Sequence, residues 1–117
     1  TVRASPETMC PIMHIKDAAR AIVELGLAPL GDIKTVNYVL AGVTPVPTAG
    51  ELMDVIRDKV SDAQIDFEPD PKLRDILSRP LRAIDDSNAR QEWGWKNEYD
   101  MERIVDEFLQ VLKTANT

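Results

Sequence analysis

Cysteine, histidine and glycine are scarce in this 117-residue sequence, and each scarcity excludes a class of site. Cys10 is the sole cysteine, so an internal disulfide is impossible and a reducing compartment fits best. Together with His14, the sole histidine, it offers only two metal ligands, so we predict no metal site. A nucleophilic Cys10–His14 pair would need fortunate geometry, and a partly buried histidine bonded to its neighbours is the favoured interpretation.

The sequence also has little positive charge and no long apolar run. Its 14 basic and 20 acidic residues give a net charge of −6, and the basic residues are scattered, unlike the patch that neutralises nucleic-acid phosphates. The longest apolar run, residues 36–43, is interrupted by Asn37 and Tyr38 and is far shorter than the ~20 residues that span a bilayer. We therefore expect neither nucleic acid nor membrane as a partner. Because the first residue is Thr1 rather than Met, we also expect a part of a longer protein.

The residues that bind and use a dinucleotide are missing from the sequence. The glycines stand at positions 26, 31, 42, 50 and 94, without the tight cluster that lets a pyrophosphate approach the backbone. A Tyr-x-x-x-Lys pair, in which a lysine lowers the pKa of the tyrosine phenol, is absent. The residue four positions after Tyr38 is Gly42, and the residue four positions after Tyr99 is Arg103. We predict no catalytic residue and no cofactor-binding residue in this chain.

Helical periodicity is the clearest positive signal. A first helix is expected from Ala18, with Asp17 as its cap, and Thr48 and Glu51 form a capping box for a second helix. The residues after Pro71 fit either a short helix or a loop. Short strands are expected at residues 11–15, 35–41 and 64–68. The predicted fold class is therefore α+β, with short strands and about four helices.

The C-terminal third contains two further helical patterns. A short helix is expected after Asp85 and Asp86, which we interpret as caps rather than as a catalytic acid and base. Trp93 and Trp95 flank Gly94, and we predict that their two rings pack in a core rather than form a platform for a ligand. The last helix follows Asp100 and carries a continuous apolar stripe, made up of Met101, Ile104, Val105, Phe108, Leu109 and Leu112.

Two segments resemble a known enzyme family. Residues 11–21 (PIMHIKDAARA) resemble the strand-to-helix junction of extended short-chain dehydrogenase/reductases, the NAD-dependent epimerase/dehydratase family. Residues 84–96 (IDDSNARQEWGWK) are similar to the segment near the C-terminus of the L-threonine 3-dehydrogenases of that family. Shorter matches between these segments follow in the same order, so the resemblance covers residues 11–112.

The resemblance implies that residues 1–117 form the small C-terminal, substrate-binding lobe of an NAD-dependent oxidoreductase, with the Rossmann domain absent. The whole enzyme would oxidise a secondary alcohol, with NAD bound by the parent and with catalytic groups upstream of this sequence. The expected partners are a small-molecule substrate and the missing N-terminal NAD-binding domain, and a homo-oligomer is a further option. The expected location is cytoplasmic, or mitochondrial if the source is an animal.

The resemblance also implies three substrate contacts, Met13, His14 and Arg79. The donor fork of an arginine suits a carboxylate or a phosphate. Threonine dehydrogenases usually carry Tyr in place of His14 and Trp in place of Arg79, so the threonine specificity is open. Arg79 followed by Pro80 is similar to sugar-nucleotide epimerases, in which the arginine grips a diphosphate. A sugar-nucleotide epimerase/dehydratase is therefore one alternative.

A free-standing, non-catalytic interaction module is the second alternative. Such a module predicts a closed and well-covered monomer. A lobe that belongs against another domain predicts a large exposed apolar surface instead.

Overall fold

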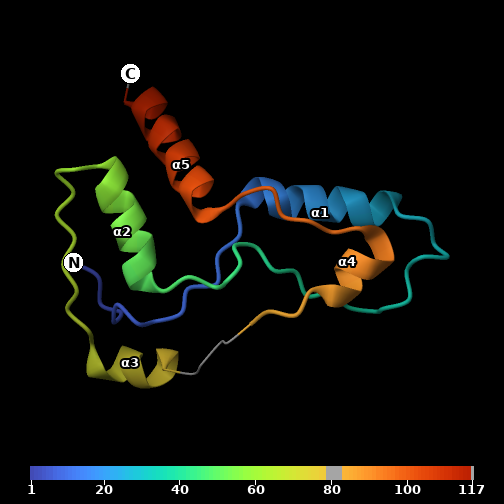
Figure 1. Ribbon diagram of the computed structural model, residues 1–117, viewed down its shortest axis with the longest axis horizontal. Coiled ribbons are helices and arrows are strands. Elements are labelled where there is room, and N and C mark those ends of the chain that lie inside the picture. Colours follow the sequence, from blue (N-terminus) through green and yellow to red (C-terminus); the bar gives the residue numbers. More distant parts are fainter. Residues whose placement is uncertain (79–82, 117) are drawn as a thin grey trace.

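A computed structural model describes residues 1–78 and 83–116 as five helices joined by long extended segments (Figure 1). The helices are α1 (Ile15–Leu27), α2 (Ala49–Lys59), α3 (Pro71–Leu77), α4 (Ser87–Trp93) and α5 (Met101–Ala115). Each lies where the sequence indicated a helix, and the choice between helix and loop after Pro71 is settled in favour of α3.

The extended segments pair only at isolated points within the described residues. Val2 pairs with Phe67 in the parallel sense, and Met9 pairs with Thr48 in the antiparallel sense. The main chain of Val2 both donates to Asp66 O at 2.7 Å and accepts from Glu68 N at 2.9 Å. Neither bridge grows into a ladder.

The strands expected at residues 11–15, 35–41 and 64–68 are therefore wrong in the described part of the chain, and the α+β label fits only roughly. A strand needs a neighbour along its whole length to satisfy its N–H and C=O groups. Here the contacts are single, such as the bond from Val43 N to Ile12 O at 3.0 Å. The chain is mostly helical, with extended connections.

The start of α1 differs from the expectation in a way that bears on the site. The helix begins at Ile15, and His14 is its N-cap, because Nδ1 of the ring accepts the N–H of Lys16 at 3.1 Å. The prediction that Asp17 caps this helix is wrong. Its carboxylate accepts hydrogen bonds from the main chain just before α5 instead of from the first turn of α1. Hydrogen bonds to an ionised carboxylate are stronger than those between neutral groups.

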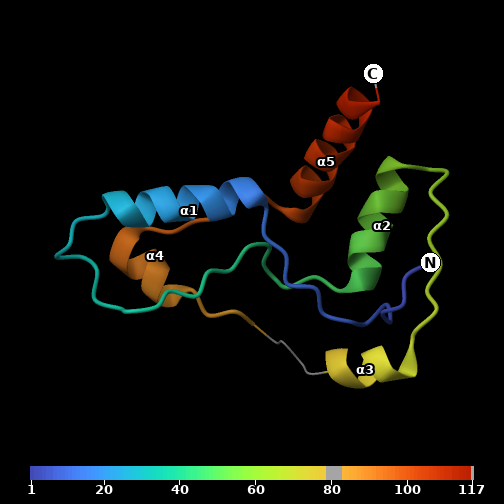
Figure 2. The same ribbon diagram turned by 180° about the vertical axis from the view of Figure 1, so that it is seen from behind.

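The main core lies between α1 and α4, which are neighbours in Figures 1 and 2. Trp95 is 2% exposed and packs with Ala21 and Ala89, while its Nε1 donates to Ala41 O at 3.3 Å. Gly94 ends α4 with a φ of 73°, a left-handed conformation that favours glycine. The packing interpretation of the two tryptophans is thereby confirmed for Trp95.

A second contact joins α2 to α5. The predicted capping box of α2 is present, since Thr48 N donates to Glu51 Oε2 at 2.8 Å and Glu51 N donates to Thr48 Oγ1 at 3.2 Å. Asp100 caps α5 as expected, through a 2.8 Å bond from Arg103 N.

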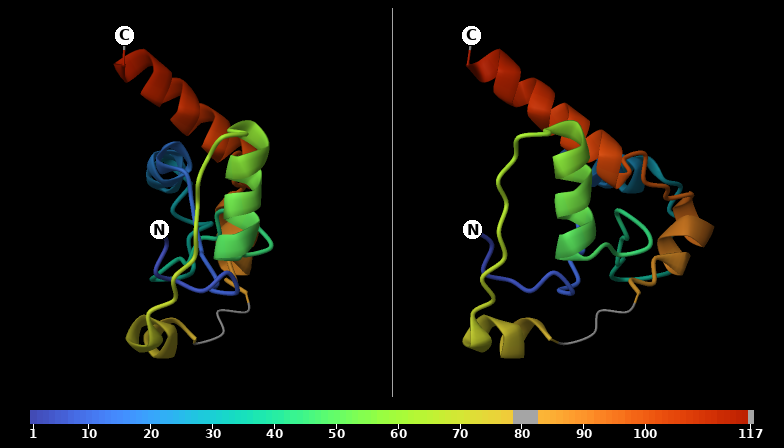
Figure 3. Two further views of the ribbon diagram at one scale, coloured as in Figure 1. Left: turned by 90° about the vertical axis from the view of Figure 1, so that its left-hand side faces the viewer. Right: turned by 60° about the vertical axis from the view of Figure 1, so that its left-hand side comes forward.

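The overall shape is flat and open. The chain measures 51 × 41 × 18 Å and its radius of gyration is 17.0 Å, whereas a compact domain of 100 residues has about 13 Å. Figure 3 shows α5 projecting beyond the rest of the chain, with α3 standing apart at the other end. Among the described residues, no helix combines the length and apolarity needed to cross a membrane.

Large apolar side chains are exposed over much of this open shape. They lie on α1, on the segment after it, on α3 and on α5, and comprise Ile15, Ile22, Val23, Leu27, Leu30, Val36, Val39, Leu73, Ile76, Leu77, Phe108, Val111 and Leu112. Monomeric proteins rarely leave so many unburied. This is the surface expected of a lobe that packs against another domain, and it argues against the closed, free-standing module.

Candidate functional site

Met13 and His14 stand at the entry to α1, where the chain passes close to residues 41–43. A Cβ on Gly42 would come within 2.2 Å of Ile12 O and 2.7 Å of Met13 Cα, so only glycine permits this approach. Met13 packs against the Trp95 core and lines a small hollow of about 100 Å³. That hollow is lined by Pro11, Ile12, Met13, Leu40, Gly42, Val43 and Ile84.

His14 is held on three sides, and its side chain is 13% exposed. Because Nδ1 accepts the Lys16 N–H, that nitrogen carries no proton, and the proton of the neutral ring lies on Nε2. The ring stacks on Tyr99, with 4.0 Å between centroids and 8° between planes. Nε2 lies 2.8 Å from Glu107 Oε2, without the alignment of a hydrogen bond. The expectation of a partly buried histidine bonded to its neighbours is confirmed.

Glu107 links α5 to the first turn of α1. Its other oxygen, Oε1, accepts a bond from Lys16 Nζ. The bond from Lys16 lowers the pKa of Glu107 below its ordinary value against the opposing effect of desolvation, and the nearby His14 acts in the same direction. The carboxylate therefore stays ionised well into the acid range.

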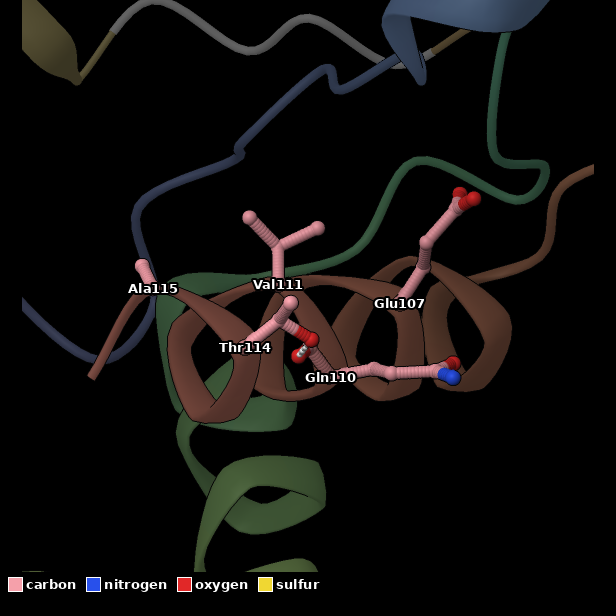
Figure 4. Close-up of a pocket in the computed structure, with 5 residues that line it drawn as sticks. All are labelled: Glu107, Gln110, Val111, Thr114 and Ala115. Carbon is pink, nitrogen blue, oxygen red and sulfur yellow. Dashed lines mark hydrogen bonds between the residues drawn. The ribbon is translucent and has the colours of Figure 1, made fainter. Parts of the chain in front are cut away.

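An open hollow of about 510 Å³ follows α5 beyond Glu107 (Figure 4). It is lined by Glu107, Gln110, Val111, Thr114 and Ala115. Glu107 and Val111 project to the same side of the helix in Figure 4. All five lining residues come from this one helix, so the hollow is a groove along α5 rather than an enclosed cleft.

Asp17 is 1% exposed and ties α1 to the segment that leads into α5. Its carboxylate accepts the N–H of Glu98 at 3.0 Å, the N–H of Tyr99 at 3.1 Å and a bond from Arg20 at 2.9 Å. Burial by itself raises the pKa of Asp17, but these donors outweigh it, Arg20 first, and hold that pKa below its ordinary value. Asp17 is thus an ionised, fully bonded group beside the His14–Tyr99 stack.

The third expected contact, Arg79, lies outside the described residues. Ser78, which precedes it, borders an open hollow of about 400 Å³ at the C-terminal end of α3. The hollow is lined by Ser5, Glu7, Thr8, Met9, Arg74, Leu77 and Ser78. Neither Met13 nor His14 lines it.

The remaining candidates serve structural roles in the described part of the chain. Burial raises the pKa of the Cys10 thiol, which opposes the thiolate that a nucleophile requires, and its Sγ contacts Thr8 O at 3.6 Å. Asp85 accepts the N–H of Ser87 at 3.0 Å, as a cap does. Asp86 binds Arg90 at 2.8 Å instead of capping. No group of three or more potential metal ligands occurs among the described residues.

Tyr99, Glu107 and Lys16 are the site residues that sequence reasoning missed. Tyr99 and Glu107 lie 85 and 93 positions after His14, and no local pattern joins them to it. The one usable signal was the position of Tyr99 directly before the cap of α5, a place where a large ring often packs back on the chain.

The geometry does not fit a dinucleotide. Within residues 1–78 and 83–116, Gly94 alone has a positive φ, and it ends α4 instead of opening a helix. The N-terminus of α1 is already occupied by the His14 ring, and that of α2 by its capping box.

Comparisons with known proteins match nearly the whole chain, although no family model matches it. The mitochondrial L-threonine 3-dehydrogenase of Bos taurus is 32% identical over 104 residues, which are 89% of this chain and 27% of that enzyme. An uncharacterized epimerase/dehydratase of Staphylococcus saprophyticus is 26% identical over 108 residues, or 92% of this chain and 33% of that protein.

The fold agrees with these relatives. The solved structure of an L-threonine dehydrogenase from Cupriavidus necator is 33% identical, with a TM-score of 0.81, over 92% of this chain and 34% of its own. The chain thus spans about a third or less of each of these three proteins. Its relatives and structural neighbours are L-threonine 3-dehydrogenases and epimerase/dehydratase proteins, and the chain corresponds to their C-terminal portion.

Proposed function

We propose that this chain is the substrate-binding lobe of an NAD-dependent oxidoreductase that oxidises a secondary alcohol. The observation that carries the proposal is the 33% identity and the TM-score of 0.81 to an L-threonine dehydrogenase over 92% of the chain. The lobe supplies substrate contacts and closure. The dinucleotide site and the groups that move the proton belong to an N-terminal domain, because the residues of this chain fit neither.

The open shape supports a domain partner. Four large apolar residues of α1 are exposed, Ile15, Ile22, Val23 and Leu27, and at helical geometry they lie along one broad side of that helix. Burying a large apolar side chain is worth about 1.5–3 kcal/mol, so several such residues supply a substantial driving force for docking. We propose that an NAD-binding domain covers this face.

Met13, His14 and Arg79 are proposed as substrate contacts. Two features support His14: its ring is held in place by Lys16 and Tyr99, and its exposed part adjoins a charged cluster able to orient a polar substrate. Met13 would supply an apolar wall beside it. Arg79 would bind a carboxylate or a phosphate of the substrate.

An exchange experiment tests the proposal. The C-terminal portion of the Cupriavidus necator enzyme is replaced by this chain, and NAD reduction is measured with L-threonine and with other small secondary alcohols. Turnover of one of them is the expected result. Arg79→Ala in the hybrid is expected to raise KM about tenfold, the cost of one lost charge-assisted contact, without changing NAD affinity. A hybrid that folds and binds NAD but oxidises no alcohol would contradict the proposal.

A sugar-nucleotide epimerase/dehydratase is the second candidate. It is favoured by the Arg79-Pro80 sequence and by the epimerase/dehydratase relative from Staphylococcus saprophyticus. The two candidates differ in what the lobe binds, because a nucleotide diphosphate carries more negative charge than an amino acid. Binding of UDP by the hybrid, lost in Arg79→Ala, would favour this candidate over an amino-acid dehydrogenase.

A further inference from the structure

Asp17 uses both carboxylate oxygens to hold one distant piece of main chain. Oδ1 accepts from Glu98 N at 3.0 Å and from Arg20 at 2.9 Å, and Oδ2 accepts from Tyr99 N at 3.1 Å. These bonds join the first turn of α1 to residues 81 and 82 positions later. The carboxylate is 1% exposed, so water cannot replace the donors that it binds.

The main chain gripped in this way carries the ring that orients His14. Tyr99 stacks on the imidazole almost in parallel, at 4.0 Å, and is itself buried. The Arg103 guanidinium lies 4.1 Å from the centroid of the Tyr99 ring. Tyr99 thus has little freedom to move unless residues 98–99 leave α1.

The cap bond alone does not fix the imidazole. Lys16 N–H defines which nitrogen is unprotonated, but a single bond leaves rotation of the ring about that contact open. The flat surface of Tyr99 removes this rotation and keeps Nε2 facing Glu107. The position of that surface depends on the bond between Tyr99 N and Asp17.

We propose that Asp17 is a positioning residue, which fixes the orientation of the His14 imidazole through the main chain and ring of Tyr99. The inference rests on the proposed function only in that His14 is a substrate-facing residue. Asp17 itself touches no substrate. It acts through the main chain of Tyr99, whose ring stacks on the imidazole.

The sole histidine makes the test direct, because the two imidazole nitrogens of His14 give one pair of signals in a ¹⁵N NMR spectrum of the chain. The neutral ring of the wild type is expected to show a single tautomer, with Nδ1 unprotonated. In Asp17→Asn the amide NH₂, in either orientation, faces a main-chain N–H or the Arg20 guanidinium, so the grip on residues 98–99 is lost. The nitrogen signals are expected to move towards the average of the two tautomers, and the ring-current shift from Tyr99 is expected to disappear.

Glu24→Gln is the matched control. It changes another carboxylate of α1 that also binds Arg20, at 2.7 Å, but that has no bond to residues 98–99. The His14 signals are expected to stay as in the wild type. If the His14 signals moved equally in Asp17→Asn and Glu24→Gln, the proposal would be overturned. Loss of any partner of Arg20 would then be enough to reorient the ring.

A second variant covers the case in which Asp17→Asn does not fold. Tyr99→Leu keeps the main-chain N–H for Asp17 and removes the ring, and the same movement of the His14 signals is expected. A folded Asp17→Asn or Tyr99→Leu chain with wild-type His14 signals would overturn the proposal. None of these readouts uses turnover, so an inactive hybrid enzyme would contradict the proposed function without touching this inference, and the reverse also holds.

Discussion

At the scale of single residues, His14 and Asp17 exchange the roles that their chemistry suggests. A short acidic side chain is the usual N-cap, yet the imidazole caps α1 and the carboxylate turns inward. The exchange follows from the donors around Asp17: two main-chain N–H groups more than 80 positions later and the guanidinium of nearby Arg20 converge on it. A lone N–H at the start of α1 is satisfied by Nδ1 of His14.

Asp17→Asn is expected to reduce stability and to flatten its acid dependence. The pKa of Asp17 is lowered in the folded chain, so the ionised group stabilises the fold above its ordinary pKa of about 4, and this contribution is lost as pH falls through the lower folded value. At neutral pH the loss should be about 2 kcal/mol, typical of hydrogen bonds to a buried charge. Urea unfolding of the wild type, Asp17→Asn and Glu24→Gln between pH 7 and about 3 measures both effects. Parallel pH curves for the wild type and Asp17→Asn would contradict the assignment.

Gly42→Ala is expected to destabilise the chain by roughly 1–3 kcal/mol, because the new methyl group would overlap Ile12 O and the backbone of Met13. Gly26→Ala serves as the control, since no atom lies within 4 Å of its Cβ position and alanine favours the interior of α1 by about 0.5–1 kcal/mol. Thermal unfolding should therefore shift in opposite directions. Equal and small shifts would show that residues 11–13 do not lie against residue 42.

At the scale of elements, the helices could be predicted and the strands could not. The capping box of α2, the left-handed Gly94 after α4 and the apolar stripe of α5 are local signals that a short stretch of sequence contains in full. An extended segment becomes a strand only when a second segment runs beside it. Residues 35–41 have β-forming side chains, but in the described chain they lack such a neighbour.

The candidate site divides in the same way. Met13 and His14 were identified because they belong to a contiguous segment, residues 11–21, that resembles the family. The partners that orient His14, Tyr99 and Glu107, are set by tertiary packing across more than 80 positions and leave no local pattern.

Thr48→Ala is expected to shorten α2 from its N-terminus and to cost about 1 kcal/mol of unfolding free energy, since the N–H of Glu51 would lose its acceptor. The box has a second bond, from Thr48 N to Glu51 Oε2, so Glu51→Ala should have a similar effect and the double variant less than the sum. Ser61→Ala, at an exposed turn, is the control. Additive losses from Thr48 and Glu51 would contradict a coupled box.

At the scale of the whole molecule, the chain is a flat, open arrangement of helices and extended segments, and many of its large apolar side chains are exposed. The radius of gyration of 17.0 Å, against about 13 Å for a compact chain of 100 residues, has no explanation in a self-contained domain. A partner domain explains both the shape and the exposed residues of α1 and α5.

The isolated chain is accordingly expected to bind a hydrophobic dye and to associate at high concentration. Replacing Ile22 and Leu27 by Gln should reduce both, with little loss of stability because both side chains are exposed in the chain alone. In the hybrid enzyme the same pair should instead weaken the fold, since the proposed partner covers that face. Dye fluorescence and sedimentation measure the first effect, and thermal unfolding of the hybrid measures the second. An unchanged hybrid would place the partner elsewhere.

The central claim is that this chain binds substrate and leaves both the dinucleotide and the proton transfer to another domain. The most direct measurement is calorimetric titration of the purified 117-residue chain with NAD, followed by an assay of NAD reduction with L-threonine and other secondary alcohols. The account predicts no saturable NAD binding and no reduction by the chain alone. Stoichiometric NAD binding, or turnover of any alcohol by these 117 residues, would contradict it.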